Sequence, residues 1–325
     1  MRVLLRPEVF DEHYHLELLV LLWLGATGRH RVLPDPLDHP TCERWVDALD
    51  ADTRKAWRTM VDDTLVREQF EPAVEEVALT NGREAAWQKV PPTLPIGDAL
   101  DVLLQPYRVI LENNVNDRAF VLALCGREAR RAVAQAEQRA WLVIEMGGGS
   151  AIVPRVRQVR CSPWLRLVTS VLVDSDAMRP AASGEDPDAV EGHQTRSVRK
   201  AADAQVHLHV LARRSIENYL PLATLDRWAS GNPSRTRVTR ALRRLSETQR
   251  HHFSMKRGFV GDQPEAHRAV RLYDGVPSKV VDALAHGFGE DIALLFGGSV
   301  RDGDEEAAGR SEVQKFVSEV LARMR

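Results

Sequence analysis

Short apolar runs alternate with helical patterns between Tyr107 and Leu211, and this alternation constrains the fold more than any other feature of the chain. Strands that are separated by helices form a parallel sheet, because each crossover helix returns the chain to the edge where the previous strand began. The predicted strands are 108–111, 141–146, 165–174 and 206–211, and the predicted helices are 117–138, 153–159 and 193–204. We therefore expect an α/β domain over residues 105–225.

The regions on either side of this domain have a different pattern. Residues 1–104 carry apolar side chains at helical spacing and are predicted to be helical, with the proline-rich segment 91–95 near their end. Residues 226–325 are also predicted to be helical. Two apolar stripes there, over 280–296 and 313–321, are expected to pack on the central domain or to form a contact in a homo-oligomer.

Composition excludes several classes of protein. The net charge of −2 gives no global basic field, so any nucleic-acid surface must be local. Three scattered cysteines argue against a disulfide scaffold and suit a reducing compartment. The most apolar run, 16–24, contains Glu17 and is too short to span a bilayer, and the acidic residues before it are wrong for a signal peptide. We expect a cytoplasmic protein with no membrane partner.

Acidic residues follow several of the predicted strands. Glu112 follows the first, Asp174 and Asp176 follow the third, and Glu217 comes shortly after the fourth. Parallel strands end at one edge of the sheet, so these carboxylates are expected to meet there. Their repulsion would be relieved by a hard divalent cation such as Mg²⁺ (or Mn²⁺), which suits phosphoryl chemistry on nucleic acid. The alternative is a strand that ends in Asp-Ser-Asp because these residues favour turns.

The order of these motifs resembles a known family. LEN at 111–113, the Asp-x-Asp at 174–176, RSIENYL at 214–220 and MKRG at 255–258 are similar to the TOPRIM domain of overcoming-lysogenisation-defect (OLD-like) nucleases and related prokaryotic defence nucleases. The resemblance covers about residues 107–260. It implies a TOPRIM-like parallel sheet flanked by helices and a Mg²⁺-dependent endonuclease that acts on DNA or RNA in antiviral defence. Because the chain has no phosphate loop, it also implies an ATPase or sensor subunit in trans.

The resemblance also implies roles for the matching residues. Glu112 would be a metal ligand or general base, and Asp174 and Asp176 would be metal ligands. Glu217 would be a further ligand or a carboxylate that orients water, and Lys256 would stabilise developing phosphate charge. The alternatives are a helix-terminal acid for Glu217 and a solvated surface lysine for Lys256.

The chain departs from the family pattern after the first strand. Asn113 stands where the family usually has glycine, and Asn116 stands where it has a second acid. Asp117, one residue later, could be that acid or could cap the following helix. This departure leaves open a non-catalytic scaffold or nucleic-acid-binding subunit as the alternative function.

The segment 234–257 concentrates positive charge, with Glu247 as its single acid. Its candidate nucleic-acid-binding residues are Arg235, Arg237, Arg240, Arg243 and Arg244. They are interpreted as contacts to a phosphate backbone. The alternative is a basic helix that pairs with acidic neighbours in the same chain or in a partner.

Overall fold

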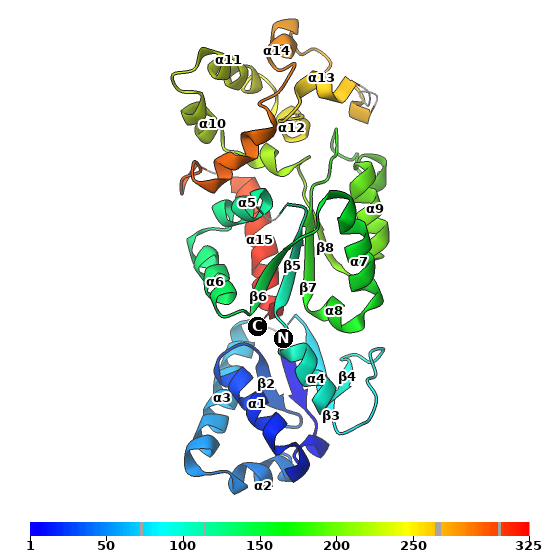
Figure 1. Cartoon of the computed structure of the whole chain (residues 1–325), viewed down its shortest axis with the longest axis vertical. Coiled ribbons are helices and arrows are strands. Elements are labelled where there is room, and N and C mark those ends of the chain that lie inside the picture. Colours follow the sequence, from blue (N-terminus) through cyan, green and yellow to red (C-terminus); the bar gives the residue numbers. More distant parts are fainter. Residues whose placement is uncertain (72–73, 114, 264–267, 305–306, 325) are drawn as a thin grey trace.

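The computed structural model describes residues 1–71, 74–113, 115–263, 268–304 and 307–324. The molecule is elongated, with one sheet in its lower part, a second sheet in its middle and a group of helices above them (Figure 1). Helix α15 (Ala307–Met324) returns from the upper part along the second sheet. Both ends of the described chain therefore lie between the two sheets.

The N-terminal unit is an α/β unit, so the prediction that residues 1–104 are helical was wrong. Its four strands are all parallel and lie in the order β2-β1-β3-β4. Its elements are β1 (Arg2–Leu5), α1 (His15–Ala26), β2 (Arg31–Pro34), α2 (Pro40–Ala48), α3 (Ala51–Phe70), β3 (Glu76–Thr80), β4 (Thr93–Pro95) and α4 (Ile96–Leu103). The strands are three to five residues long, too short for a strand periodicity to stand out against a helical one.

The middle unit has the predicted parallel α/β architecture, with strand order β6-β5-β7-β8. Its elements are β5 (Tyr107–Leu111), α5 (Asn116–Leu124), α6 (Arg127–Gln138), β6 (Leu142–Met146), α7 (Ile152–Cys161), α8 (Pro163–Leu167), β7 (Thr169–Val173), α9 (His193–Ala202), β8 (His207–Val210) and the 3-10 helix η5 (Ile216–Tyr219). The chain adds β6 on one side of β5 and then β7 and β8 on the other. The topology thus switches between β5 and β7, where a crevice forms outside the carboxyl ends of the strands.

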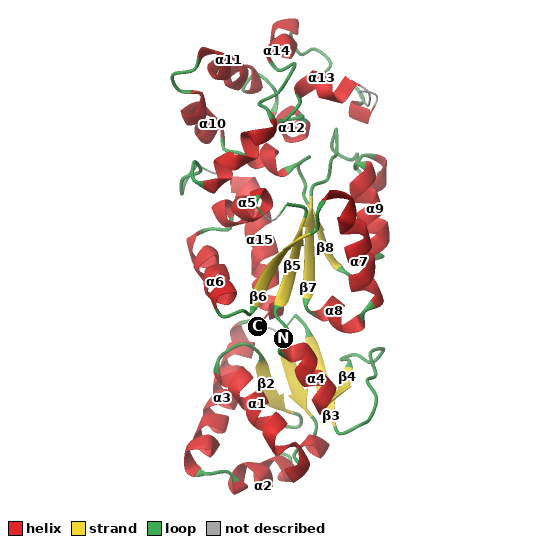
Figure 2. Ribbon diagram, viewed as in Figure 1, coloured by secondary structure: helices red, strands yellow, loops and turns green. Residues whose placement is uncertain are grey.

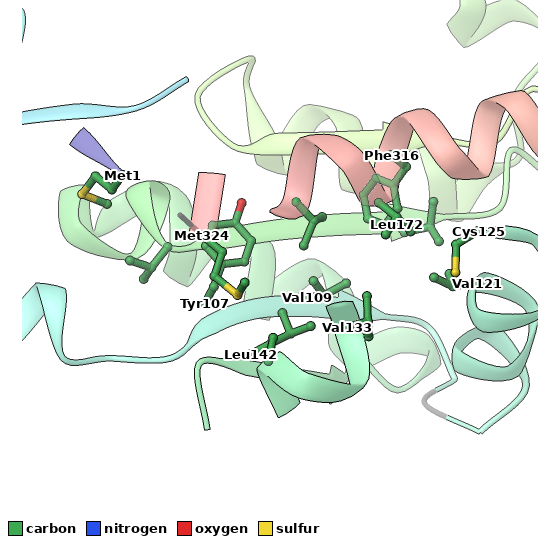
Figure 3. Packing of buried hydrophobic residues seen from close by; sticks show 14 of the residues in the cluster. Met1, Tyr107, Val109, Val121, Cys125, Val133, Leu142, Leu172, Phe316 and Met324 are labelled. Atoms are coloured by element: carbon green, nitrogen blue, oxygen red, sulfur yellow. The ribbon is translucent and has the colours of Figure 1, made fainter. Parts of the chain in front are cut away.

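Helices cover both faces of this sheet, with α5, α6 and α15 on one face and α7, α8 and α9 on the other (Figure 2). Alternate residues of β5 point to opposite faces, so Val109 joins one apolar cluster and Ile110 joins the other. Figure 3 shows Phe316 of α15 beside Leu172 of β7. The first cluster also contains Met1, so one core continues from the lower sheet into the middle one.

The upper group of helices, here called the helical cap, spans residues 222–297. It contains α10 (Leu222–Ala229), α11 (Pro233–Leu242), α12 (Glu247–His252), α13 (Gly258–Asp262), α14 (Ser278–Ala283) and the 3-10 helix η7 (Glu290–Gly297). The prediction of a helical C-terminal region is confirmed for the described residues after 226, none of which lies in a strand. Both apolar stripes are buried within the chain, for example at Leu284 and Val313. The second stripe covers the middle sheet and does not belong to the cap.

Two further predictions concern the whole chain. Cys42, Cys125 and Cys161 are all free thiols, as their scatter in the sequence suggested. Within the described ranges, no helix combines the length and hydropathy that a bilayer-spanning segment requires.

We expect the docking of α15 to carry a large part of the stability. Phe316→Ala should lower the free energy of unfolding by about 3–5 kcal/mol, because Phe316 is only 2% exposed and its loss leaves a cavity against the sheet. Phe70→Ala is the matched control, since Phe70 is 79% exposed, and it should change stability by less than about 0.5 kcal/mol. Urea unfolding of the two variants measures both values. Equal losses would contradict the role of α15 as core.

Candidate functional site

A cavity of about 560 Å³ lies at the carboxyl ends of the middle sheet. Its charged lining residues are Glu112, Asp117, Asp174, Asp176, Glu217 and Lys256. Every residue predicted to be catalytic or metal-binding therefore lines one cavity, together with Asp117, whose role the sequence left open. Five carboxylates face a single ammonium group there.

The register of the strands brings the first acids together. Leu111 of β5 lies opposite Leu172 of β7, so Glu112 and Asp174 leave neighbouring strands at the crevice between them. The extended conformation ends after Val173, and Asp176 adopts a left-handed backbone with φ of 50°. Aspartate tolerates this conformation better than most residues. The two aspartates thus enter the cavity from a turn and not from a continuing strand.

Glu112 is held by Gln194 in the first turn of α9. The side-chain nitrogen of Gln194 donates to Oε1 of Glu112 and also to the main-chain oxygen of Gly149, 3.2 Å away. Burial raises the pKa of Glu112 to about 7, and the negative charges of Asp176 and Asp117 contribute to the rise. Gln194 thereby fixes an acid that titrates near neutral pH.

Asp117 lines the cavity, and its side chain also holds the turn that precedes α5. Its Oδ2 accepts a hydrogen bond of 2.8 Å from the main-chain nitrogen of Asn113, which closes the turn after β5. The side chain of Asn113 in turn accepts from the main-chain nitrogen of Asn116 at 3.2 Å and so caps the start of α5. Burial, with a smaller contribution from the Glu217 carboxylate, raises the pKa of Asp117 to about 6.

Glu217 is buried and Asp174 is half-buried in the cavity. Oδ1 of Asp174 accepts from the main-chain nitrogen of Ile216 at 3.0 Å. Burial raises the pKa of Asp174 well above its ordinary value, and the charges of Glu217 and Asp117 add to this effect. Because Glu217 is only 1% exposed, its ionised form requires a partner within the protein.

Lys256 supplies that partner. Its Nζ lies 3.0 Å from Oε1 of Glu217. Burial lowers the pKa of Lys256, but the charge and hydrogen bond of Glu217, together with the charges of Asp174 and Glu290, outweigh burial and raise the pKa, so the amine stays protonated. The other oxygen of Glu217, Oε2, is buried and has no hydrogen-bond partner among the described residues. The alternatives of a solvated lysine and a simple helix-terminal acid therefore do not describe this pair.

Each residue of the Glu-Asn-Tyr motif fixes a different part of the molecule to the site. Glu217 faces the cavity, while Nδ2 of Asn218 donates to the main-chain oxygen of Phe253 at 2.9 Å, just before Lys256. The hydroxyl of Tyr219 donates to Glu312 of α15. The motif thus connects the cavity, the helical cap and the helix that covers the sheet.

Two glycines and Gln194 belong to the site, and sequence reasoning missed the roles of all three. Gly258 of the MKRG motif has φ of 63°, and a Cβ there would lie 2.1 Å from the main-chain oxygen of Leu284. A Cβ on Gly192 would lie 2.3 Å from Cβ of Asp176. Nothing in the sequence marks Gly192 or Gln194 beyond their place at the start of a predicted helix.

As the side chains stand, no three His, Cys, Asp or Glu residues in the described ranges are placed to hold one metal ion. Four of the five carboxylates, those of Glu112, Asp117, Asp174 and Glu217, are bound to four different neighbours. The donor set still fits a hard cation, since it is all oxygen and each donor occupies one of several acceptor positions on a carboxylate. The unpartnered Oε2 of Glu217 is a position where a cation would offset the cost of burial.

The predicted basic residues are all exposed, but they differ in their contacts. Arg243 is paired with Asp226, and the guanidinium of Arg235 lies 4.5 Å from the centre of the Trp228 ring. The remaining three, Arg237, Arg240 and Arg244, line a second hollow that shares no lining residue with the carboxylate cavity. Lys256, although close in sequence, belongs to the carboxylate cavity.

Comparison of the chain with models of protein families, with curated proteins and with solved structures gives no match. The resemblance to TOPRIM nucleases therefore rests on the motif residues, and it stays a prediction.

Replacing Glu112 should reveal the cost of its burial. A carboxyl whose pKa is about 7 in the folded protein and near 4.5 when unfolded destabilises the fold above pH 7, and this penalty is lost as pH falls towards 4.5. With metal chelated, Glu112→Gln should raise the free energy of unfolding at pH 8 by about 1–2 kcal/mol, allowing for water in the open cavity. Near pH 4.5 the variant should match the original protein.

The control is Glu128→Gln, at an exposed position of α6 with no ion pair among the described residues. Urea unfolding at pH 4.5 and pH 8 measures the difference. A gain for Glu112→Gln that is equal at the two pH values would show that the charge of Glu112 carries no penalty.

Proposed function

We propose that the chain is a metal-dependent endonuclease of the TOPRIM type that cleaves phosphodiester bonds in DNA or RNA, with Mg²⁺ (or Mn²⁺) as its cofactor. The observation that carries the proposal is the gathering of five carboxylates and one lysine at the switch point of a parallel sheet. A surplus of buried like charge destabilises a fold, and such surpluses are typical of sites that bind cations or move protons. The place of the cavity is also the usual ligand site of open parallel sheets.

The charged residues of the cavity divide into three proposed roles: ligands of the cation, a general base and a donor to the phosphate. Glu112, Asp174 and Asp176 would hold the cation, and Glu217 would be a further ligand. When bound, the cation supplies Lewis acidity at the phosphate and lowers the pKa of water. Glu112 is also the candidate for the second role, that of the general base which accepts a proton from an attacking water.

Lys256 has the third role. Its ammonium group is held in the cavity by Glu217 and stays charged. It can donate to a phosphate oxygen as negative charge develops there. Arg237, Arg240 and Arg244, which line the second hollow, are included in the proposal as contacts to the backbone of the strand. A role in antiviral defence and activation by a separate ATPase or sensor rest on the family resemblance alone.

A non-catalytic scaffold is the second candidate. It is favoured by one observation, namely that no three acidic side chains in the described part of the chain are arranged around a common point. The two candidates differ in whether metal binds and whether strands are cut.

The test is a cleavage assay on DNA and RNA, with Mg²⁺ and with chelator. Asp174→Asn should reduce Mg²⁺-dependent cleavage by at least about 100-fold, because loss of an outer-shell residue alone often costs 10–100-fold. The fold should remain, and its stability without metal should rise as repulsion falls. Asp101→Asn, on the exposed side of α4, is the matched control and should retain full activity.

Calorimetry with Mg²⁺ alone separates the candidates. Metal binding that is lost in Asp174→Asn supports the nuclease. If the original chain neither binds Mg²⁺ nor cuts either polymer, the scaffold is correct.

A further inference from the structure

A hollow of about 680 Å³ lies between α11 and α14 of the helical cap, within the size range of small-ligand pockets. Its charged lining residues are Arg237, Arg240, Arg244 and Lys279, and none of the residues that line it is acidic. Both helices lie at the far end of the cap from the middle sheet (Figure 1). This basic hollow is therefore separate from the carboxylate cavity.

The spacing of the arginines explains how they come together. Arg237, Arg240 and Arg244 follow one another at intervals of three and four residues, which places them on one side of α11 and its C-terminal end. Lys279 comes from α14, which packs against α11. Two helices thus contribute cations to the same hollow.

These four cations have no counterion of their own. No side chain among them makes a hydrogen bond or an ion pair with another residue in the part of the chain that the structure describes. The neighbouring arginines behave differently, since Arg243 pairs with Asp226 and Arg235 stacks on Trp228. Arg235 also has no acidic partner among the described residues, but it lies outside the hollow, so the four cations of the hollow are distinguished by their shared position. Like charges held this close repel, and an anion would relieve the repulsion.

The residues that line the hollow indicate whether it suits the phosphate groups or the base of a ligand. It is apolar, with Ala241 and Val280 buried and Ala283 beside them. No aromatic ring is among the lining residues, so the hollow offers no surface on which a base could stack. Guanidinium groups, in contrast, match phosphate oxygens with two parallel hydrogen bonds.

We propose that the basic hollow binds consecutive phosphate groups, as found in a nucleoside polyphosphate or in a short stretch of nucleic-acid backbone. Four cations suit a ligand of this kind, because a triphosphate carries about three to four negative charges near neutral pH. The proposal does not depend on the carboxylate cavity being catalytic. It also narrows the predicted phosphate contacts to three of the five arginines and adds Lys279, which the sequence did not single out.

The probe is inorganic tripolyphosphate, titrated calorimetrically into the full chain at about 0.1 M salt. The variant Arg237→Ala/Arg240→Ala removes two charges from the hollow and should weaken binding at least tenfold, since each lost charge-assisted hydrogen bond contributes severalfold. The variant Arg235→Ala/Arg243→Ala removes the same charge from the same segment outside the hollow. It should bind within about twofold of the original chain. All four positions are exposed, so both variants should fold.

Competition then identifies the source of the phosphates. Displacement of tripolyphosphate by ATP, but not by a single-stranded oligonucleotide, assigns the hollow to a free nucleotide. Displacement by the oligonucleotide and not by ATP assigns it to a strand. The proposal is wrong if the original chain shows no saturable binding of tripolyphosphate, or if the two double variants weaken it equally.

Discussion

Repulsion among carboxylates at the crevice between β5 and β7 is the constraint on which the rest of the structure depends. Asp174 lies among other acids, and its pKa lies well above the ordinary range. Glu112, Asp117, Asp174 and Glu217 are each held by a donor, and the donors come from different elements. Gln194 belongs to α9, the main-chain nitrogen of Ile216 to η5 and Lys256 to the cap. Satisfying the acids thus fixes three separate elements to the edge of one sheet.

The helical cap is held to that edge by more than Lys256. Arg214, in the loop after β8, makes two hydrogen bonds of 2.6 and 2.7 Å to the carboxylate of Asp262 at the end of α13. Asn218 holds the loop before Lys256 from the same side. The only ammonium group of the cavity therefore depends on the cap for its position. The basic hollow lies in the same group of helices, so the helical cap contributes both Lys256 and the cations of the basic hollow.

The acids of the site could be predicted because they obey a general rule of parallel sheets, by which the ends of successive strands share one edge. The strand pattern alone was enough to place Glu112 and Asp174 at that edge of the sheet. Gln194 could not be found in this way, since its role depends on where α9 begins in space. The left-handed turn at Asp176 could not be predicted either, because the sequence Asp-Ser-Asp is compatible both with a turn and with a strand that continues.

The lower sheet was missed for another reason. Its strands are short, and β2 is buried along its whole length, so polar residues do not alternate with apolar ones. Buried strands of this kind resemble segments of buried helix, and only their length argues against one. The middle sheet has strands of similar length but was recognised, because clear helical patterns separate its strands.

The return of α15 along the middle sheet has a consequence for how the protein is made. This helix covers Leu172 and its neighbours and receives the hydroxyl of Tyr219 at Glu312, yet it follows every other described element in the chain. During synthesis, one face of the sheet leaves the ribosome before the helix that buries it exists. Contacts between such distant segments slow folding and leave apolar surface open to aggregation. The contact that joins Tyr219 to α15 forms only after that helix has been translated, and until then the apolar face of the sheet that α15 covers is exposed.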